Sequence, residues 1–278
     1  MATNKRSPEQ IREHYLLEKK LANRLRNSSR EERKKLYTEL YNELYHKLPH
    51  HPRWTRNENY QEKINKINAK MRFLKRYLGP DINFLEIGPG DCLLSREVSK
   101  HVKLVYALDV SDEVSRDCEW PENFHFILSD GVSIPLENAS VDIVFSNQMM
   151  EHLHPDDAMN QVRNIYNVLK PGGKYLCITP NRLNGPHDIS RYFDEIATCF
   201  HLREYTVTEL VELFKKAGFP SISFIIRIGN KYIFEMFPFT IIKFTEKILE
   251  KMPHSLARKL AGLPPIKILI NCIVVAIK

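Results

Sequence analysis

Cysteine is scarce in this 278-residue chain, and the few cysteines present do not form pairs of the CxxC type. They are scattered and odd in number: Cys92, Cys118, Cys177, Cys199 and Cys272. Cysteine-based zinc sites and disulfide frameworks both show cysteines at recognisable spacings. We therefore expect no disulfide framework, no metal site and a reducing compartment.

Long apolar runs are also missing. No run reaches the roughly 18 apolar residues that a membrane-spanning helix needs. The first residues, "MATNKRSPEQIREHY", lack the apolar core of a secretory signal. From these two absences the sequence predicts a cytoplasmic protein.

Positive charge is concentrated near the N-terminus. Residues 1–80 hold 20 Lys and Arg against 9 Asp and Glu, a net charge of +11, whereas the remaining residues are net −4. Such asymmetry can mark a surface for nucleic acid or anionic membrane, or simply a solvated helical face. Because no aromatic-interleaved basic motif of a known RNA module is present, nucleic acid is disfavoured as a partner.

The residue pattern divides the chain into two parts. Residues 1–80 read as a helical N-terminal extension, in which Leu36, Leu40, Leu44 and Leu48 recur every four residues beside tyrosines of the same spacing. This helix ends at the prolines of "PHHPRW" (49–54), and a second helix is expected over about 58–78. Residues 81–278 form the predicted main domain.

In the main domain, short apolar runs alternate with helix-length segments. The expected strands are 82–87, 103–110, 123–128, 141–146, 173–179, 221–228 and 267–278. The expected helices include 91–101, 111–118, 156–169 and one within 205–219, for which Thr208 is the expected N-cap and Gly218 the end. This alternation predicts an α/β fold with a Rossmann-like, seven-stranded, mostly parallel sheet flanked by helices. A helical insertion or lid is expected over 233–265, before the last strand.

The stretch "FLEIGPGDCLLS" (84–95) joins the first strand to the first helix by a glycine-rich turn. A dinucleotide fingerprint would need a third glycine where Leu93 stands. Glu86 would also place a negative charge beside a diphosphate, which is unfavourable. The turn therefore disfavours a nicotinamide cofactor and favours a ligand that carries a cation or an amine.

Four segments together resemble the motifs of class I S-adenosylmethionine-dependent methyltransferases. These are "LEIGPGDC", "YALDVS", "LSDGVSIPLENASVDIVFSNQMMEHL" and "LKPGGKYLCITPN", in the family's order and at similar spacing over about residues 82–220. The resemblance implies S-adenosyl-L-methionine as cofactor, with S-adenosyl-L-homocysteine as the product. Cys92 stands where the family commonly has a third small residue, glycine.

The resemblance also implies a cofactor role for nine residues. Glu86, Gly88 and Gly90 would meet the methionine end, and Asp109 with Val110 would meet the ribose. Ser129, Asp130 and Gly131 would lie at the adenine, and Asn147 would lie where the cofactor and acceptor pockets meet. Without the resemblance, Asp109 and Asp130 could equally be helix caps.

Candidate bases follow the fourth and fifth strands, where ligands of open α/β sheets bind. A base is needed only if the methyl acceptor carries a proton at pH 7. We name His187, His154 and Tyr192 as candidate catalytic residues, and we expect His152 in "MMEHLHPDD" to be structural.

Residues 234–252 include an apolar face flanked by lysines and arginine. They could cap the core, cover a hydrophobic acceptor or touch a membrane surface as a peripheral contact. The sequence thus predicts a methyltransferase of a small, apolar or amphipathic metabolite at oxygen, nitrogen or carbon. The alternatives are methylation of RNA or protein, and a non-catalytic S-adenosylmethionine-binding module. The oligomeric state is unknown.

Overall fold

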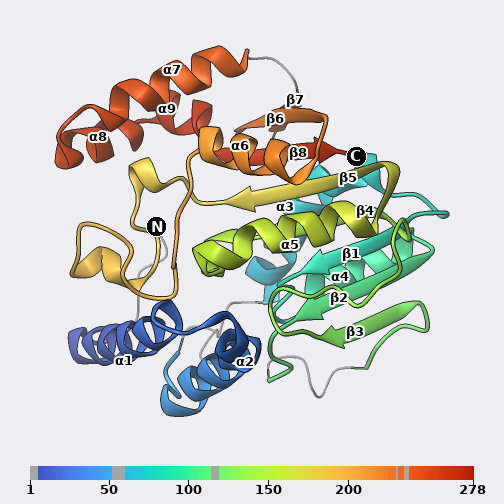
Figure 1. The fold of residues 1–278 in the computed structure, drawn as a ribbon, viewed down its shortest axis with the longest axis horizontal. Coiled ribbons are helices and arrows are strands. Elements are labelled where there is room, and N and C mark those ends of the chain that lie inside the picture. The colour runs from blue at the N-terminus through green and yellow to red at the C-terminus, as the bar shows by residue number, and fades with distance from the viewer. Residues whose placement is uncertain (1–5, 52–59, 114–118, 230, 235–237) are drawn as a thin grey trace.

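The central element of the protein is a twisted sheet with helices on both faces (Figure 1). The computed structural model describes residues 6–51, 60–113, 119–229, 231–234 and 238–278. The strands are β1 (Asn83–Ile87), β2 (Leu104–Asp109), β3 (Phe124–Leu128), β4 (Val141–Asn147), β5 (Leu169–Thr179), β6 (Ser221–Ile228), β7 (Lys231–Phe234) and β8 (Cys272–Ile277). Their order in the sheet is β3-β2-β1-β4-β5-β8-β6-β7.

Strands β1 to β5 pair in parallel, and the last three strands pair antiparallel to their neighbours. The predicted Rossmann-like, mostly parallel sheet is confirmed. Its seven expected strands are all present, and the short strand β7 extends the edge by pairing with β6. The chain order reverses between β1 and β4, the position where open α/β sheets bind ligands.

Two apolar cores lie on opposite faces of this sheet. One is formed with α5 (Pro155–Val168) and α6 (Val207–Ala217), and the other with α3 (Tyr60–Leu74) and α4 (Leu93–Val98). Helix α6 begins at Thr206, whose side chain accepts a hydrogen bond from the Glu209 amide, and ends at Gly218 in the left-handed conformation. The sheet is therefore covered on both sides, as the apolar strand runs predicted.

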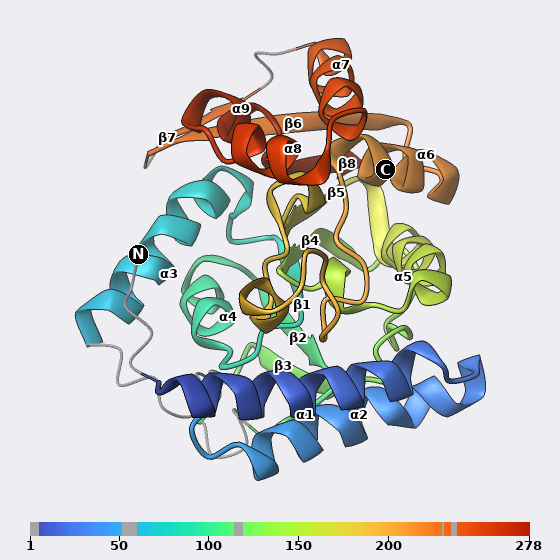
Figure 2. The same cartoon turned by 90° about the vertical axis from the view of Figure 1, so that its left-hand side faces the viewer.

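The N-terminal helices form a hairpin at the carboxyl edge of the sheet. Helix α1 (Pro8–Arg26) and helix α2 (Arg30–Lys47) lie across this edge in Figure 2. Between them, Ser29 caps α2 reciprocally with Glu32, a break that the leucine spacing did not locate. The domain boundary expected at residue 80 stays a prediction.

The insertion before the last strand is helical, as expected, although its details differ. It contains α7 (Phe239–Glu250), α8 (His254–Ala261) and α9 (Pro264–Leu269). The expectation that the last strand starts at residue 267 is wrong, because two prolines at the first turn start helix α9 and the strand begins only at Cys272. The strand β7 also occupies the first positions of the expected insertion.

Two further expectations touch residues that the structure does not describe. Most of the helix expected over 111–118 lies outside the described residues, as do residues 235–237 of the segment 234–252. In the described part of the chain, no helix is both long and apolar enough to cross a membrane. Short 3-10 turns, η1 (Lys75–Tyr77), η2 (Ser99–His101), η3 (Met150–His152), η4 (Arg182–Asn184) and η5 (Ile189–Tyr192), complete the fold.

Candidate active site

A cavity lies at the carboxyl edge of the sheet, above the point where β1 and β4 separate. It has two adjoining parts that share Gly88, Gly90, Gln148 and His152 as lining residues. The first part reaches over Asp109 to the tyrosines of α2. The second runs from Glu86 toward α3, β6 and β8. One elongated ligand can therefore contact both parts.

The glycine-rich turn forms the floor that both parts share. Gly88 and Gly90 have φ values of 72° and 61°, which glycine adopts without strain. A Cβ on Gly88 would lie 3.2 Å from Met149, so the turn also needs a residue without a side chain there. Cys92 adopts φ 54°, which explains why glycine is common at this position in the family that the turn resembles.

Glu86 lies at the end of β1, almost completely buried, and lines the second part of the cavity. Burial raises the pKa of its carboxyl group, opposed by the nearby charge of Lys70 and by a hydrogen bond donated by the Ser95 hydroxyl. A carboxylate held in this way gains most from a cationic partner. It fits the ammonium of an amino-acid ligand.

Asp109 ends β2 and connects the two loops of the floor. Its carboxylate accepts hydrogen bonds from the amide of Gly90 at 2.9 Å and from the amide of Val110 at 2.7 Å. The amide of Ser111 also points to this carboxylate, at 3.4 Å, so three backbone amides fix the carboxylate at the floor of the cavity. Val110 lines the same part of the cavity.

The loop after β3 contributes Gly131 to the cavity, whereas its neighbours shape the loop. Asp130 accepts hydrogen bonds from the amides of Val132 and Ser133 at 2.9 and 2.6 Å. Burial alone would raise the pKa of Asp130, but these hydrogen bonds outweigh it and the pKa is lowered. Ser129 donates to the carbonyl of Ser133 at 2.8 Å. Gly131 has φ 86°, and a Cβ there would lie 2.8 Å from the Tyr37 ring.

Helix α2 forms the roof of the first part of the cavity. Tyr37, Tyr41 and Tyr45 line it, and Tyr37 also packs with Leu40, Leu44 and Leu48 in the core shared with α1. The regular spacing of both residue types was visible in the sequence. It did not reveal that the tyrosines line a cavity.

A buried ion pair attaches α2 to the main domain. Arg33 donates to both carboxylate oxygens of Asp157, at 2.7 and 2.9 Å, and both side chains are at most 4% exposed. The Tyr37 hydroxyl donates to Asp157 at 3.0 Å and accepts from the amide of His154 at 2.8 Å. Burial raises the pKa of Tyr37 well above its usual range, so this hydroxyl keeps its proton. The roof is thus held in a defined position.

His152 lies at the junction of the two parts of the cavity. Its Nδ1 atom is 2.9 Å from the Tyr41 hydroxyl and 3.0 Å from the carbonyl oxygen of Phe200. A carbonyl oxygen only accepts, so Nδ1 carries the hydrogen in this arrangement and the lone pair of the neutral ring is on Nε2. Asn147 lines the second part, and Gln148 next to it adopts φ 59°, a strained conformation for a residue other than glycine.

The three candidate bases named from the sequence lie elsewhere. His154 caps α5, with its Nδ1 accepting from the amide of Asp156 at 3.2 Å. The His187 ring contacts the Asn181 carbonyl and the Asn184 side chain at 3.1 and 2.7 Å. Tyr192 is 46% exposed on η5. None of the three lines the cavity, and their contacts are those of structural or surface residues. The geometry favours His152, which sequence reasoning had taken as structural.

Comparison with known proteins identifies the domain that carries this cavity. Residues 85–177 match a family model described as "Methyltransferase domain". The chain is 42% identical over 166 residues to a probable S-adenosylmethionine-dependent methyltransferase of Mycolicibacterium smegmatis, covering 58% of this chain and 60% of the relative. It is 37% identical over 90 residues to another from Mycobacterium tuberculosis, covering 32% and 31%. The chain thus spans 60% or less of the length of these two relatives.

A solved structure shares the fold. It is a putative methyltransferase of Haloferax volcanii in complex with the activator Trm112, with a TM-score of 0.54 at 16% identity over 81% of this chain and 95% of that one. Residues 85–177 therefore match a methyltransferase domain, and the chain is similar in sequence and in fold to S-adenosylmethionine-dependent methyltransferases. The cofactor of this domain is S-adenosyl-L-methionine, as predicted.

Proposed function

We propose that the protein transfers the methyl group of S-adenosylmethionine to a small amphipathic metabolite, releasing S-adenosylhomocysteine. The observation that carries this proposal is the two-part cavity at the β1–β4 switch point, with a carboxylate at each end of the glycine-rich floor. The relatives' printed names support methyl transfer from S-adenosylmethionine and do not name an acceptor. A non-catalytic binding role is less well supported, because space for a second ligand adjoins the cofactor floor.

The proposed cofactor contacts are assigned from the residues that line the cavity and from the loops that support them. Glu86 would receive the ammonium group, the turn at Gly88 and Gly90 would lie against the methionine chain, and Asp109 would accept both ribose hydroxyls. Val110 and Gly131 would enclose the adenine beneath the tyrosines of α2. Ser129 and Asp130 would act by fixing the loop, and Asn147 would face the sulfonium. These roles are predictions that mutation can test.

Methyl transfer from a sulfonium needs little activation of the electrophile. The acceptor atom attacks the methyl carbon in line while the carbon–sulfur bond breaks and its electrons remain on sulfur. The protein therefore contributes mainly alignment, together with removal of the acceptor's proton where it has one. His152 is the side chain that we assign to this proton, because it lines both parts of the cavity and Tyr41 and Phe200 fix its ring.

The second part of the cavity supports an amphipathic acceptor. Its walls combine apolar Ile178 and Ile273 with polar Asn271 and the cationic side chains of Lys70 and Arg227. A wholly apolar molecule would leave these polar groups unpaired, whereas a molecule with a polar or anionic end would satisfy them.

The positive charge of the N-terminal segment gives little support to RNA or protein as the methyl acceptor. Several of the basic side chains there have internal partners. Arg33 pairs with Asp157, Arg26 donates to the carbonyls of Thr198, Cys199 and His201, and Arg24 pairs with Glu43. These contacts favour a structural role for much of the basicity over an RNA-binding role.

Substituting His152 tests the proposed reaction. With S-adenosylmethionine and the small-molecule fraction of a cell extract, we expect S-adenosylhomocysteine to form with the native protein. His152→Asn should lower the rate by about 100-fold or more while cofactor affinity changes little, since general bases contribute roughly 10²–10⁴. Mass spectrometry of the product measures this, and His125→Asn, on the exposed side of β3, is the matched control.

Two results would contradict the proposal. One is product formation only with the RNA or protein fraction of the extract. The other is an unchanged rate in His152→Asn. That result would show that His152 is not the base, although methyl transfer itself could still take place.

A peripheral membrane contact through α7 also remains a proposal. Ile241, Phe244 and Ile248 lie on one face of this helix, 40–66% exposed, beside the exposed Lys243 and Lys247. Apolar side chains next to basic ones fit an anionic lipid surface. Vesicles containing phosphatidylglycerol should bind the native protein and not Phe244→Glu, with Leu16→Glu on α1 as control. Equal binding of native protein and Phe244→Glu would exclude α7 as the contact.

A further inference from the structure

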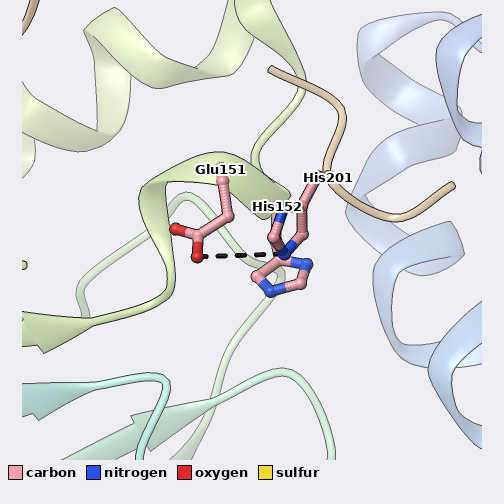
Figure 3. A group of neighbouring side chains, drawn as sticks. All are labelled: Glu151, His152 and His201. Carbon is pink, nitrogen blue, oxygen red and sulfur yellow. Dashed lines mark ion pairs between the residues drawn. The ribbon is translucent and has the colours of Figure 1, made fainter. Parts of the chain in front are cut away.

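Three side chains with metal-ligating atoms meet beside the cavity. Glu151 and His152 lie on η3, and His201 lies in the segment that follows η5. Figure 3 shows the three side chains directed toward one another. One ligand atom from each lies within 4.8 Å of the other two. Residues separated by about 50 positions in the chain thus form one compact group.

The carboxylate of Glu151 is buried with few hydrogen-bond donors. Its side chain is completely buried, and its Oε2 atom accepts a hydrogen bond from the Thr179 hydroxyl at 2.8 Å. Its Oε1 atom has no hydrogen-bond partner among the described residues and lies 4.0 Å from Nε2 of His201. Burial raises the pKa of this carboxyl group to about 7, opposed by the charge of His201. A buried carboxylate oxygen without a donor is costly unless a cation lies beside it.

The two histidines are held as metal-binding histidines usually are. Nδ1 of His201 is 2.6 Å from the carboxylate of Glu204, and Nδ1 of His152 is 3.0 Å from the Phe200 carbonyl oxygen. In metalloproteins, a carboxylate or carbonyl on one ring nitrogen fixes the orientation of the ring and raises the basicity of the other. The Glu204–His201 pair therefore has the form of an outer support for a ligand.

The distances suit one ion. Bonds from a metal to histidine nitrogen and carboxylate oxygen are each about 2.0–2.2 Å, so ligand atoms around one tetrahedral ion lie roughly 3.4 Å apart. The 4.0 Å between Glu151 and His201 would therefore shorten slightly by side-chain rotation. The 4.8 Å limit on the remaining separations needs only small side-chain rotations.

We propose that Glu151, His152 and His201 bind one divalent transition-metal ion. Two imidazoles and one carboxylate favour zinc, iron, cobalt or manganese over magnesium or calcium, which prefer oxygen ligands. The sequence predicted no metal site because that prediction rested on cysteine spacing, whereas this group contains no cysteine. Since His152 also lines the cofactor cavity, the ion would lie at its wall. Because the ion would occupy the Nε2 lone pair of His152, this side chain could act as the proposed base only in the metal-free protein. Metal binding therefore does not require that the proposed methyl transfer is correct.

Cobalt and zinc loading test the proposal. Purified protein stripped with a chelator should bind one equivalent of Co²⁺ with visible d–d absorption, and Zn²⁺ should displace it. Glu151→Gln and His201→Asn should each weaken Co²⁺ binding by more than about 100-fold. Glu204→Gln, which alters only the support, should weaken it by about 10–100-fold. His125→Asn, an exposed histidine on β3, should bind as the native protein does.

Anomalous diffraction from a cobalt-loaded crystal keeps the test decisive if a variant fails to fold. A single cobalt peak among the three side chains supports the proposal. The proposal is overturned if the folded native protein binds no stoichiometric Co²⁺ or Zn²⁺, or if the metal lies at surface histidines. In that case His201 acts as a charged bridge between Glu151 and Glu204.

Discussion

Asp109→Ala is expected to weaken binding of S-adenosylhomocysteine by about 10²–10⁴-fold. Two hydrogen bonds from ribose hydroxyls to a carboxylate contribute roughly 1.5–3 kcal/mol each, and each 1.4 kcal/mol is about tenfold in affinity. The substitution also removes the acceptor that holds the amides of Gly90 and Val110. Titration calorimetry measures the affinity, and circular dichroism establishes that the variant is folded.

Two further variants separate the causes. Asp109→Asn keeps one acceptor oxygen but no charge, so an intermediate loss is expected. Asp81→Ala changes an exposed carboxylate before β1 and should leave affinity unchanged. If Asp109→Ala bound S-adenosylhomocysteine as tightly as the native protein, Asp109 would have no role in binding the cofactor.

Arg33→Met should lower the free energy of unfolding by about 3–5 kcal/mol. Removing one partner of a buried ion pair leaves the other charge without compensation, and Asp157 is only 1% exposed. The affinity for S-adenosylhomocysteine should fall as well, because α2 carries the tyrosines that roof the first part of the cavity. Urea denaturation followed by circular dichroism gives the stability change.

The double variant Arg33→Met with Asp157→Leu serves as the control for this prediction. Replacing both charges by apolar groups should restore much of the lost stability, since buried ion pairs are often no more stable than apolar replacements. Arg24→Met breaks a more exposed pair with Glu43 and should cost at most about 1 kcal/mol. An Arg33→Met variant as stable as Arg24→Met would show that the Arg33–Asp157 pair does not hold α2 in place.

The glycine-rich floor of the cavity was predictable from sequence because each of its parts is local. Glu86, the glycines and Asp109 stand at strand ends, and parallel strands bring such positions to one edge of the sheet. The apolar runs that predicted these strands are each only a few residues long, so they can be recognised without knowledge of distant contacts. The same reasoning identified α7, but its prediction of Thr208 as the N-cap of α6 is wrong, because Thr206 caps this helix.

The remaining features depend on contacts between distant segments. Tyr41 meets His152 across 111 positions, and Arg33 meets Asp157 across 124. No local pattern distinguishes a tyrosine that lines a cavity from one that packs on a neighbouring helix. His154 and His187 illustrate the converse, because both follow strands as catalytic residues do, yet their rings are engaged by nearby structural groups.

Calorimetry of the native protein with S-adenosylhomocysteine and with NAD tests the central claim most directly. A floor with Glu86 at one end and Asp109 at the other should bind S-adenosylhomocysteine at one site per chain, with NAD binding undetectable or far weaker. NAD binding that is equal or tighter would contradict the account, since the diphosphate would then be accommodated beside Glu86.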